Sequence, residues 1–222
     1  MGIKSVMNTD RLYWLGRYSE RVYTTLKLFS ISFDTLIEQY SEDHQEFCRS
    51  LEIPNIYRDK DDFIDTYAFS LDDPNSIISN LHRAYDNAIE LREEIGSETL
   101  SFIQIAIYEM NYAKASDAPL LHFQKITDAL LAFWGCVDDQ IDDENTRNII
   151  KIGKRVERLD LYARLEKDRS AIRREVNRLA GRISRTDLIY RKEDLQKLKD
   201  LAEEPELRYR DIILTVEQLV EC

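Results

Sequence analysis

The hydrophobic positions near the start of the chain repeat with the period of a helix that packs along another long helix. Two parallel rows consist of Leu15, Val22, Phe29 and Leu36, and of Leu12, Ser19, Leu26, Phe33 and Tyr40. Neighbours within each row are seven residues apart, which is the spacing of a packing seam on a helix. The pattern predicts a helix from about Thr9 to Tyr40, with Asn8 or Thr9 as its N-terminal cap.

The rest of the chain shows further helical periods, separated by Pro, Gly and Asp signals. Asp73 is expected to cap one helix, with Pro74 in its first turn and an end near Gly96. The other expected helices cover residues 44–51, 63–70, 97–108, 119–134, 145–165, 172–183, 190–202 and 207–220, with 172–183 and 190–202 as an antiparallel pair. Apart from the two short segments 44–51 and 63–70, the sequence therefore predicts an all-α bundle of about eight helices. No linker is visible, so we expect a single domain over residues 1–222.

One short pattern occurs twice, in Leu15–Arg21 and in Ile152–Arg158. Each stretch reads aliphatic, Gly, basic, two further residues, Glu, Arg. A glycine inside a helix costs roughly 1 kcal/mol relative to alanine, so Gly16 and Gly153 predict the close approach of another backbone or of a ligand. The pattern indicates two long, related helices at the centre of the bundle.

A structural interpretation of this repeat is that the two helices cross at their glycines. Glu20 would then pair with Arg158, and Glu157 would pair with Arg21. Reciprocal pairs of this kind fix the register of two helices without any chemistry of their own, because buried charges need partners.

A functional interpretation places the same side chains around a water-accessible cavity. Arg17, Arg21 and Arg158 would present donors to a carboxylate or a phosphate. Glu20 or Glu157 would bind an amine or act as a base. Both interpretations remain open at the level of the sequence.

Composition narrows the class of protein further. Only 6 Gly and 4 Pro occur among 222 residues, which favours helices, and the net charge is −11. An acidic chain is a poor candidate for nonspecific binding to nucleic acid or to an anionic membrane, although the run Arg169–Arg191 is locally rich in Arg. The cysteines and histidines lack the spacing of metal ligands: Cys48, Cys136, Cys222, His44, His82 and His122. We therefore expect neither a metal nor a cofactor. We also expect a cytoplasmic protein, since no stretch is apolar enough to span a bilayer.

Asp138, Asp139 and Asp142 fit the acidic motif with which all-α isoprenoid synthases hold Mg²⁺. No second acidic motif is evident. The alternative is an exposed acidic turn, in which Asp142 or Asp143 favours the positive end of a helix that starts near Asn145.

Four segments in this order resemble the alpha-E family of bacterial helical proteins, which is named for a Glu-Arg pair. The segments are Tyr13–Arg21, Phe69–Ile77, Arg83–Arg92 with Asn87 inside it, and Ile149–Asp160. The resemblance extends from about Met7 to Leu165 and departs from the family at Lys154, where Arg is common. Each segment is short, so the specificity lies in their combination.

The resemblance implies a helical protein of unassigned activity. Its members are commonly encoded or fused beside ATP-grasp-type ligases and transglutaminase-like proteins, which implies a component of a peptide ligation or peptide modification system. Such a component would bind its substrate or partner through the Arg/Glu cluster. The alternatives are an enzyme that acts on a peptide or amino-acid derivative with the same cluster, and a Mg²⁺-dependent isoprenoid-diphosphate enzyme. The candidate cluster consists of Trp14, Gly16, Arg17, Glu20, Arg21, Asn87, Gly153, Glu157 and Arg158.

Overall fold

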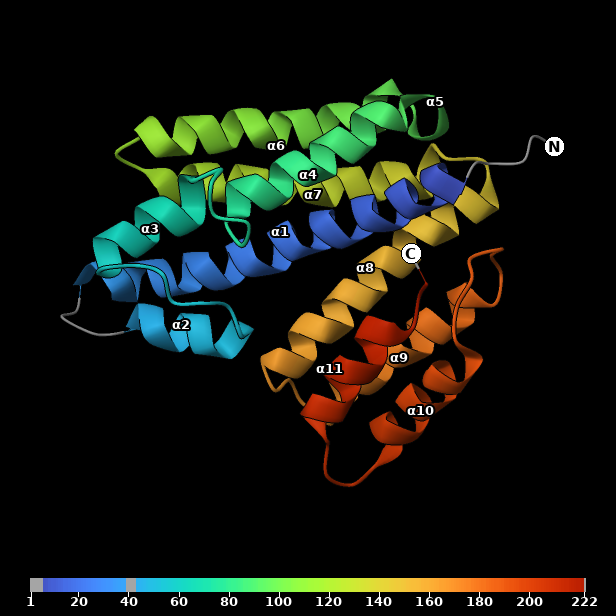
Figure 1. Ribbon diagram of the computed structural model, residues 1–222. Coiled ribbons are helices and arrows are strands. Elements are labelled where there is room, and N and C mark those ends of the chain that lie inside the picture. Colours follow the sequence, from blue (N-terminus) through green and yellow to red (C-terminus); the bar gives the residue numbers. More distant parts are fainter. Residues whose placement is uncertain (1–5, 39–42, 222) are drawn as a thin grey trace. The chain divides into compact units, whose positions relative to one another are not determined.

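The computed structural model describes residues 6–38 and 43–221, and every regular element in this part is a helix (Figure 1). The helices are α1 (Val6–Glu38), α2 (Asp43–Leu51), α3 (Lys60–Phe69), α4 (Ile77–Glu90), α5 (Arg92–Ile95), α6 (Ser97–Ala115), α7 (Pro119–Asp139), α8 (Glu144–Arg164), α9 (Arg169–Ile183), α10 (Lys192–Glu203) and α11 (Tyr209–Gln218). The all-α class is confirmed. The predicted number of about eight is too low, because the described part already contains eleven helices, some of them very short. None of these helices has the length and apolar character needed to cross a membrane.

The chain divides into two compact units, and the division falls within α1. The first unit contains residues 6–20 of α1 together with α8, α9, α10 and α11. The second unit is Arg21–Ile141, which carries the rest of α1 and the helices α2 to α7. The expectation of one domain over residues 1–222 stays a prediction.

The hydrophobic rows of α1 are buried, as their spacing predicts. The side chains of Leu12, Leu15, Ser19, Val22, Leu26 and Phe29 have no exposed surface, and Phe33 is also buried. The side chain of Leu36 and the residue Tyr40 lie outside the described part of the chain. The predicted cap at Asn8 or Thr9 is wrong, because the helix already contains Val6 and both polar residues lie inside it.

In the first unit, α9 and α11 lie beside α8, and α10 packs against α9 and α11 (Figure 1). Asp143 caps α8: its carboxylate accepts hydrogen bonds from the backbone N–H and the hydroxyl of Thr146. This confirms the predicted role of the acidic turn before this helix. Asp168 caps α9 in the same way, through the N–H of Ala171, and α9 therefore begins earlier than the hydrophobic pattern indicates.

In the second unit, α6 and α7 lie side by side over much of their length (Figure 1). Aromatic rings from several of its helices meet around Phe29. The ring of Phe29 lies 5.8 Å from the rings of Phe63, Tyr67 and Phe123, measured between centroids. Aromatic contacts at this range stabilise a core beyond the burial of their surface.

The start of α4 differs from the prediction. Asp73 does not cap the helix, because its carboxylate accepts hydrogen bonds from the hydroxyl of Tyr57 and the N–H of Asn75. Ser76 is the cap instead, and its hydroxyl accepts from the N–H of Ser79 at 3.0 Å. The helix is also interrupted at Leu91, which separates α4 from the short α5, whereas the hydrophobic pattern predicts one continuous helix through this turn.

Replacement of Ser76 by Ala should therefore destabilise the protein. The Ser76 hydroxyl is fully buried and also donates to the carbonyl of Ser70 at 2.6 Å, so Ser76→Ala leaves two backbone groups without this partner. We expect a loss of about 1–2 kcal/mol in the free energy of unfolding, measured in urea. Ser101→Ala is the matched control, because Ser101 lies inside α6 and its hydroxyl donates only to the carbonyl of Glu98 in the same helix. Equal losses in both variants would contradict the assignment of Ser76 as the cap.

Candidate functional site

The two glycines of the repeated pattern lie where α1 and α8 touch. A Cβ atom built on Gly16 would lie 1.9 Å from the carbonyl oxygen of Ile150, and one built on Gly153 would lie 2.1 Å from the carbonyl oxygen of Tyr13. No side chain fits at such distances, so the two backbones are in direct contact. The predicted meeting of the two stretches is confirmed.

This contact is reciprocal. Gly16 lies against the carbonyl group three residues before Gly153, and Gly153 lies against the carbonyl group three residues before Gly16. An approximate two-fold relation between the two segments therefore accompanies their shared sequence pattern. Residues at equivalent positions of the pattern are expected to have equivalent neighbours.

The first carboxylate of the cluster belongs to Glu20, which has no exposed surface. Arg158 binds it with two parallel hydrogen bonds, from Nε to Oε1 at 2.6 Å and from Nη2 to Oε2 at 2.9 Å. This fork geometry is the strongest form of a guanidinium–carboxylate pair. The predicted Glu20–Arg158 pair is confirmed.

The second carboxylate belongs to Glu157, which is also fully buried. Its Oε2 accepts a hydrogen bond from Nε of Arg17 at 2.7 Å, a pair that the sequence did not predict. The predicted partner, Arg21, belongs to the other unit, so the Glu157–Arg21 pair stays a prediction. Lys154 occupies the position equivalent to Arg17, and the charge of Glu20 acts on its ammonium group, as the two-fold relation requires.

Burial shapes the protonation of these groups. Burial opposes the charge of Arg17, but Glu157, Tyr13 and Asp160 together raise its pKa above the ordinary value. Arg158 behaves alike: burial opposes its charge, and Glu20 raises its pKa. Lys154 is different, since burial, together with the nearby cations and against the attraction of Glu20, lowers its pKa to about 7. The two arginines are therefore permanent charges, whereas the lysine titrates near neutral pH.

One edge of the cluster is open to solvent. The guanidinium carbon of Arg17 lies 5.0 Å from the ring centroid of Trp14, within the range of a cation–π contact. Trp14 in turn stacks on Tyr18, with ring centroids 5.3 Å apart. Both aromatic side chains are partly exposed, so they form an accessible rim beside the buried ion pairs.

The first unit thus brings together seven members of the candidate cluster: Trp14, Gly16, Arg17, Glu20, Gly153, Glu157 and Arg158. Arg21 and Asn87 belong to the second unit, where the side chain of Asn87 donates to the carbonyl of Arg83 inside α4. Glu20 and Glu157 are both sealed from solvent and bonded to arginines, which is the arrangement of the structural interpretation.

The three aspartates of the acidic motif are divided between the two units. Asp138 and Asp139 end α7 in the second unit and are exposed, whereas Asp142 belongs to the first unit and is also exposed. Within residues 6–38 and 43–221, no group of three or more His, Cys, Asp or Glu side chains is placed to hold a metal ion.

Another charged group on α8 and α9 was not predicted as a site. It contains Lys151, Arg155, Glu175 and Arg182, in which cations outnumber carboxylates. The only sequence signal for it was the Arg-rich run Arg169–Arg191. That run gives no information about which arginines turn toward α8.

The fold and the Glu-Arg helices define an all-α protein whose central crossing is built from a duplicated motif. Residues 8–196 match the Alpha-E family, described as a predicted alpha-helical domain with a conserved ER motif. The chain belongs to this family. Its sequence contains Glu followed by Arg at two places, Glu20-Arg21 and Glu157-Arg158, and these are the two motifs that meet at the crossing. Comparisons with curated proteins and with solved structures found no match.

Substitution of the crossing glycine should disrupt this contact. Gly16→Ala places a Cβ atom against the Ile150 carbonyl, so we expect a loss of at least about 2 kcal/mol in the free energy of unfolding. Gly181→Ala is the control, because a Cβ atom on Gly181 meets nothing within 4 Å and α9 should gain about 0.5–1 kcal/mol. Thermal or urea unfolding of both variants measures the difference, and a stable Gly16→Ala protein would refute the backbone contact.

Removal of one buried carboxylate charge should also be strongly destabilising. Glu20→Gln leaves Arg158 without its counter-charge, and breaking a buried pair costs about 3–5 kcal/mol. Glu204→Gln makes the same chemical change in a pair of similar length, 2.6 Å to Arg208, that lies at the surface. Surface pairs contribute little, so this control should unfold close to the wild-type protein. If urea unfolding shows equal effects for the two variants, the crossing does not depend on the Glu20 charge.

Proposed function

We propose that this chain is the helical, binding component of a bacterial peptide ligation or peptide modification system. It would work beside an ATP-grasp-type ligase or a transglutaminase-like protein. Membership of the Alpha-E family supports this proposal, together with the genetic and fusion context that the resemblance implies. The proposed compartment is the cytoplasm.

The observation that carries the binding role is the state of the Glu-Arg cluster. Both carboxylates have no exposed surface, and each is bonded to an arginine of the other helix. A general base or an amine-binding carboxylate must reach its substrate, whereas Glu20 and Glu157 are engaged in holding α1 against α8. The cluster therefore supports a binding role for the surface that it positions, rather than chemistry at the carboxylates.

The surface best placed for this role is the rim of Trp14 and Tyr18, which lies against the buried Arg17. Aromatic side chains and arginine are enriched where proteins recognise partners, because they offer a large apolar area with polar ends. Their stacking on α1 fixes their rotamers before binding, which reduces the entropy lost on association. We propose that the partner or the peptide substrate contacts the cluster through this rim.

The alternative of an enzyme that uses the same cluster requires a cavity open to water beside Glu20 and Glu157, and their burial does not favour it. The alternative of a diphosphate enzyme depends on Asp138, Asp139 and Asp142. No observation on the described residues favours this alternative either.

The proposal is tested with the kind of partner that the family resemblance implies, an ATP-grasp-type ligase from the source organism. We expect the two proteins to co-elute in size-exclusion chromatography, and the turnover of the ligase to rise when this chain is added. Trp14→Ala should weaken both effects about tenfold or more, as for an aromatic residue at the centre of an interface. Tyr112→Ala, which removes an aromatic ring that is 63% exposed on α6, should change neither. Absence of a complex together with an unchanged turnover would show that the proposed function is wrong.

A further inference from the structure

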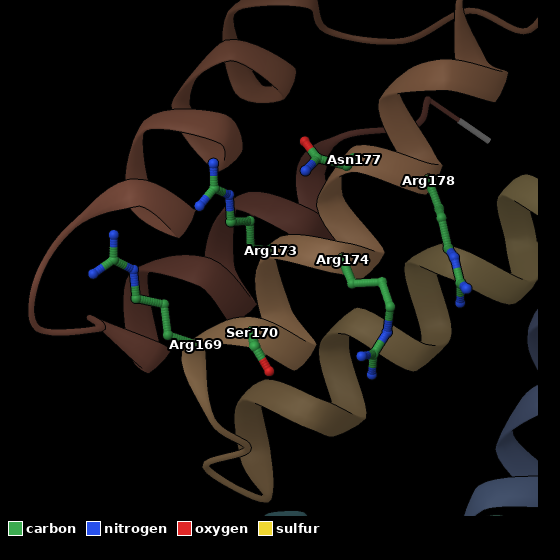
Figure 2. A pocket seen from close by; sticks show the side chains of 6 residues that line it. All are labelled: Arg169, Ser170, Arg173, Arg174, Asn177 and Arg178. Carbon is green, nitrogen blue, oxygen red and sulfur yellow. The ribbon is translucent and has the colours of Figure 1, made fainter.

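The outward face of α9 carries a hollow of about 630 Å³. Its lining consists of Arg169, Ser170, Arg173, Arg174, Asn177 and Arg178. From Ser170 onward these positions recur at intervals of three and four residues, so they lie along one face of the helix. Figure 2 shows Arg169 and Arg173 on one side of the helix and Arg174 and Arg178 on the other. The α9 hollow, as we call these six residues, thus presents two pairs of guanidinium groups.

The first pair of guanidinium groups shares one carboxylate. Glu203, at the end of α10, lies 2.7 Å from Arg173 and 4.0 Å from Arg169. Arg169 also donates a hydrogen bond to the backbone carbonyl of Glu203 at 3.0 Å. One negative charge therefore faces two positive charges on this side of the hollow.

The second pair shares its carboxylate with a third arginine. Glu175 lies 3.7 Å from Arg174 and 3.0 Å from Arg178, and it also binds Arg155 of α8 at 2.7 Å. The carboxylate of Asp168, just before the hollow, is engaged as the cap of α9. Positive charges therefore outnumber negative ones around the α9 hollow, although the chain as a whole has a net charge of −11.

The arginines of the hollow are accessible to a ligand. Their side chains are between 45% and 54% exposed. Ion pairs at such exposure contribute little to stability, because water competes with both partners. A guanidinium group of the hollow can therefore exchange the carboxylate of its own chain for one that a ligand supplies.

The spacing of the arginines fits a row of carboxylates. Within each pair the two residues are four positions apart, which is about 6 Å along a helix axis. Side chains on the same face of an extended peptide are about 7 Å apart. A run of Asp or Glu can therefore meet both arginines of a pair, whereas a single small anion cannot span both pairs.

The neutral side chain of Asn177 also favours a peptide. Its exposed amide offers both a donor and an acceptor, which is the combination that a peptide group requires. A phosphodiester backbone offers acceptors only. A long nucleic acid would also extend beyond the hollow, where the acidic remainder of the chain repels it.

We propose that the α9 hollow binds a short acidic peptide segment, rich in Asp or Glu. The carboxylates of the segment pair with the arginines on the two sides of the helix, and its backbone lies against Asn177. This surface is distinct from the Glu-Arg crossing and from the rim of Trp14 and Tyr18. The inference does not rest on the proposed function.

Fluorescence anisotropy on the purified full chain measures this binding. The probe is labelled hexaglutamate at physiological ionic strength, and hexaglutamine and an oligothymidylate of equal charge are the comparisons. We expect hexaglutamate to bind, its affinity to fall as salt is added, and both comparisons to bind much more weakly.

Loss of charge from the hollow should weaken the complex. The double variant Arg173→Gln, Arg174→Gln removes one arginine from each side and leaves Glu175 bonded to two other arginines. Its affinity for hexaglutamate should fall about tenfold, because two charge-assisted contacts are lost. The matched control is Arg191→Gln, Arg208→Gln, which removes two similarly exposed and paired arginines outside the hollow. Its affinity should stay close to that of the wild-type chain.

A variant that gains affinity separates the proposal from an effect on folding. Glu203→Gln removes the carboxylate that competes for Arg169 and Arg173, so hexaglutamate should bind severalfold more tightly. Glu204→Gln makes the same chemical change at the next residue, whose partner is Arg208. This control should leave the affinity almost unchanged.

Three results would overturn the proposal. The first is that hexaglutamate does not bind, and the second is that the oligothymidylate binds as tightly as hexaglutamate. The third is that Glu203→Gln and Glu204→Gln change the affinity equally, since general electrostatic attraction would then account for the binding. If the double arginine variant fails to fold, the comparison of these two glutamate variants still decides.

Discussion

The rest of the first unit depends on the contact between two helix backbones at Gly16 and Gly153. The absence of side chains at these two positions lets α1 and α8 approach until glycine meets carbonyl on both sides. At this separation, a residue one turn beyond either glycine faces the other helix with no room for water. Glu20 and Glu157 lie at that position, so the approach of the backbones itself creates the need for Arg158 and Arg17.

The buried ion pairs explain the specificity of the crossing better than they explain its stability. The desolvation of two charges nearly cancels their attraction, and apolar side chains often stabilise a core as well or better. Apolar residues, however, tolerate a shift of one helix along the other, whereas a forked Arg158–Glu20 pair tolerates none. The two halves of the motif are not identical, since Arg17 remains charged while Lys154 titrates near neutral pH. The two-fold relation thus holds for the backbone and the carboxylates but not for the cations around them.

Much of the fold could be predicted from the sequence because it depends on residues that are close together in the chain. The rows of α1, the starts of α6 at Ser97 and of α7 at Pro119, and the cap at Asp143 all follow from neighbouring residues. The cap of α4 was not predictable. The hydroxyl of Tyr57, sixteen residues before Asp73, donates a hydrogen bond to the Asp73 carboxylate, and Ser76 caps the helix instead. The meeting of the two glycines was predictable from the repeat, although the partner of Arg17 was not, since it depends on the angle of the crossing. The cationic group at Lys151 and Arg182 was hidden for a similar reason: an Arg-rich helix does not reveal which of its sides faces a neighbour.

The wide separation of the two motifs along the chain also has a consequence for biosynthesis. Glu20 and Arg158 are 138 residues apart, so the first motif leaves the ribosome long before its partner exists. Until then, the start of α1 carries a carboxylate and an uncovered glycine face that only α8 can complete. The first unit can therefore assemble only after α8 has been synthesised, because it combines residues before Arg21 with residues after Ile141. Long-range closure of this kind slows folding relative to helices that pack on their immediate successors.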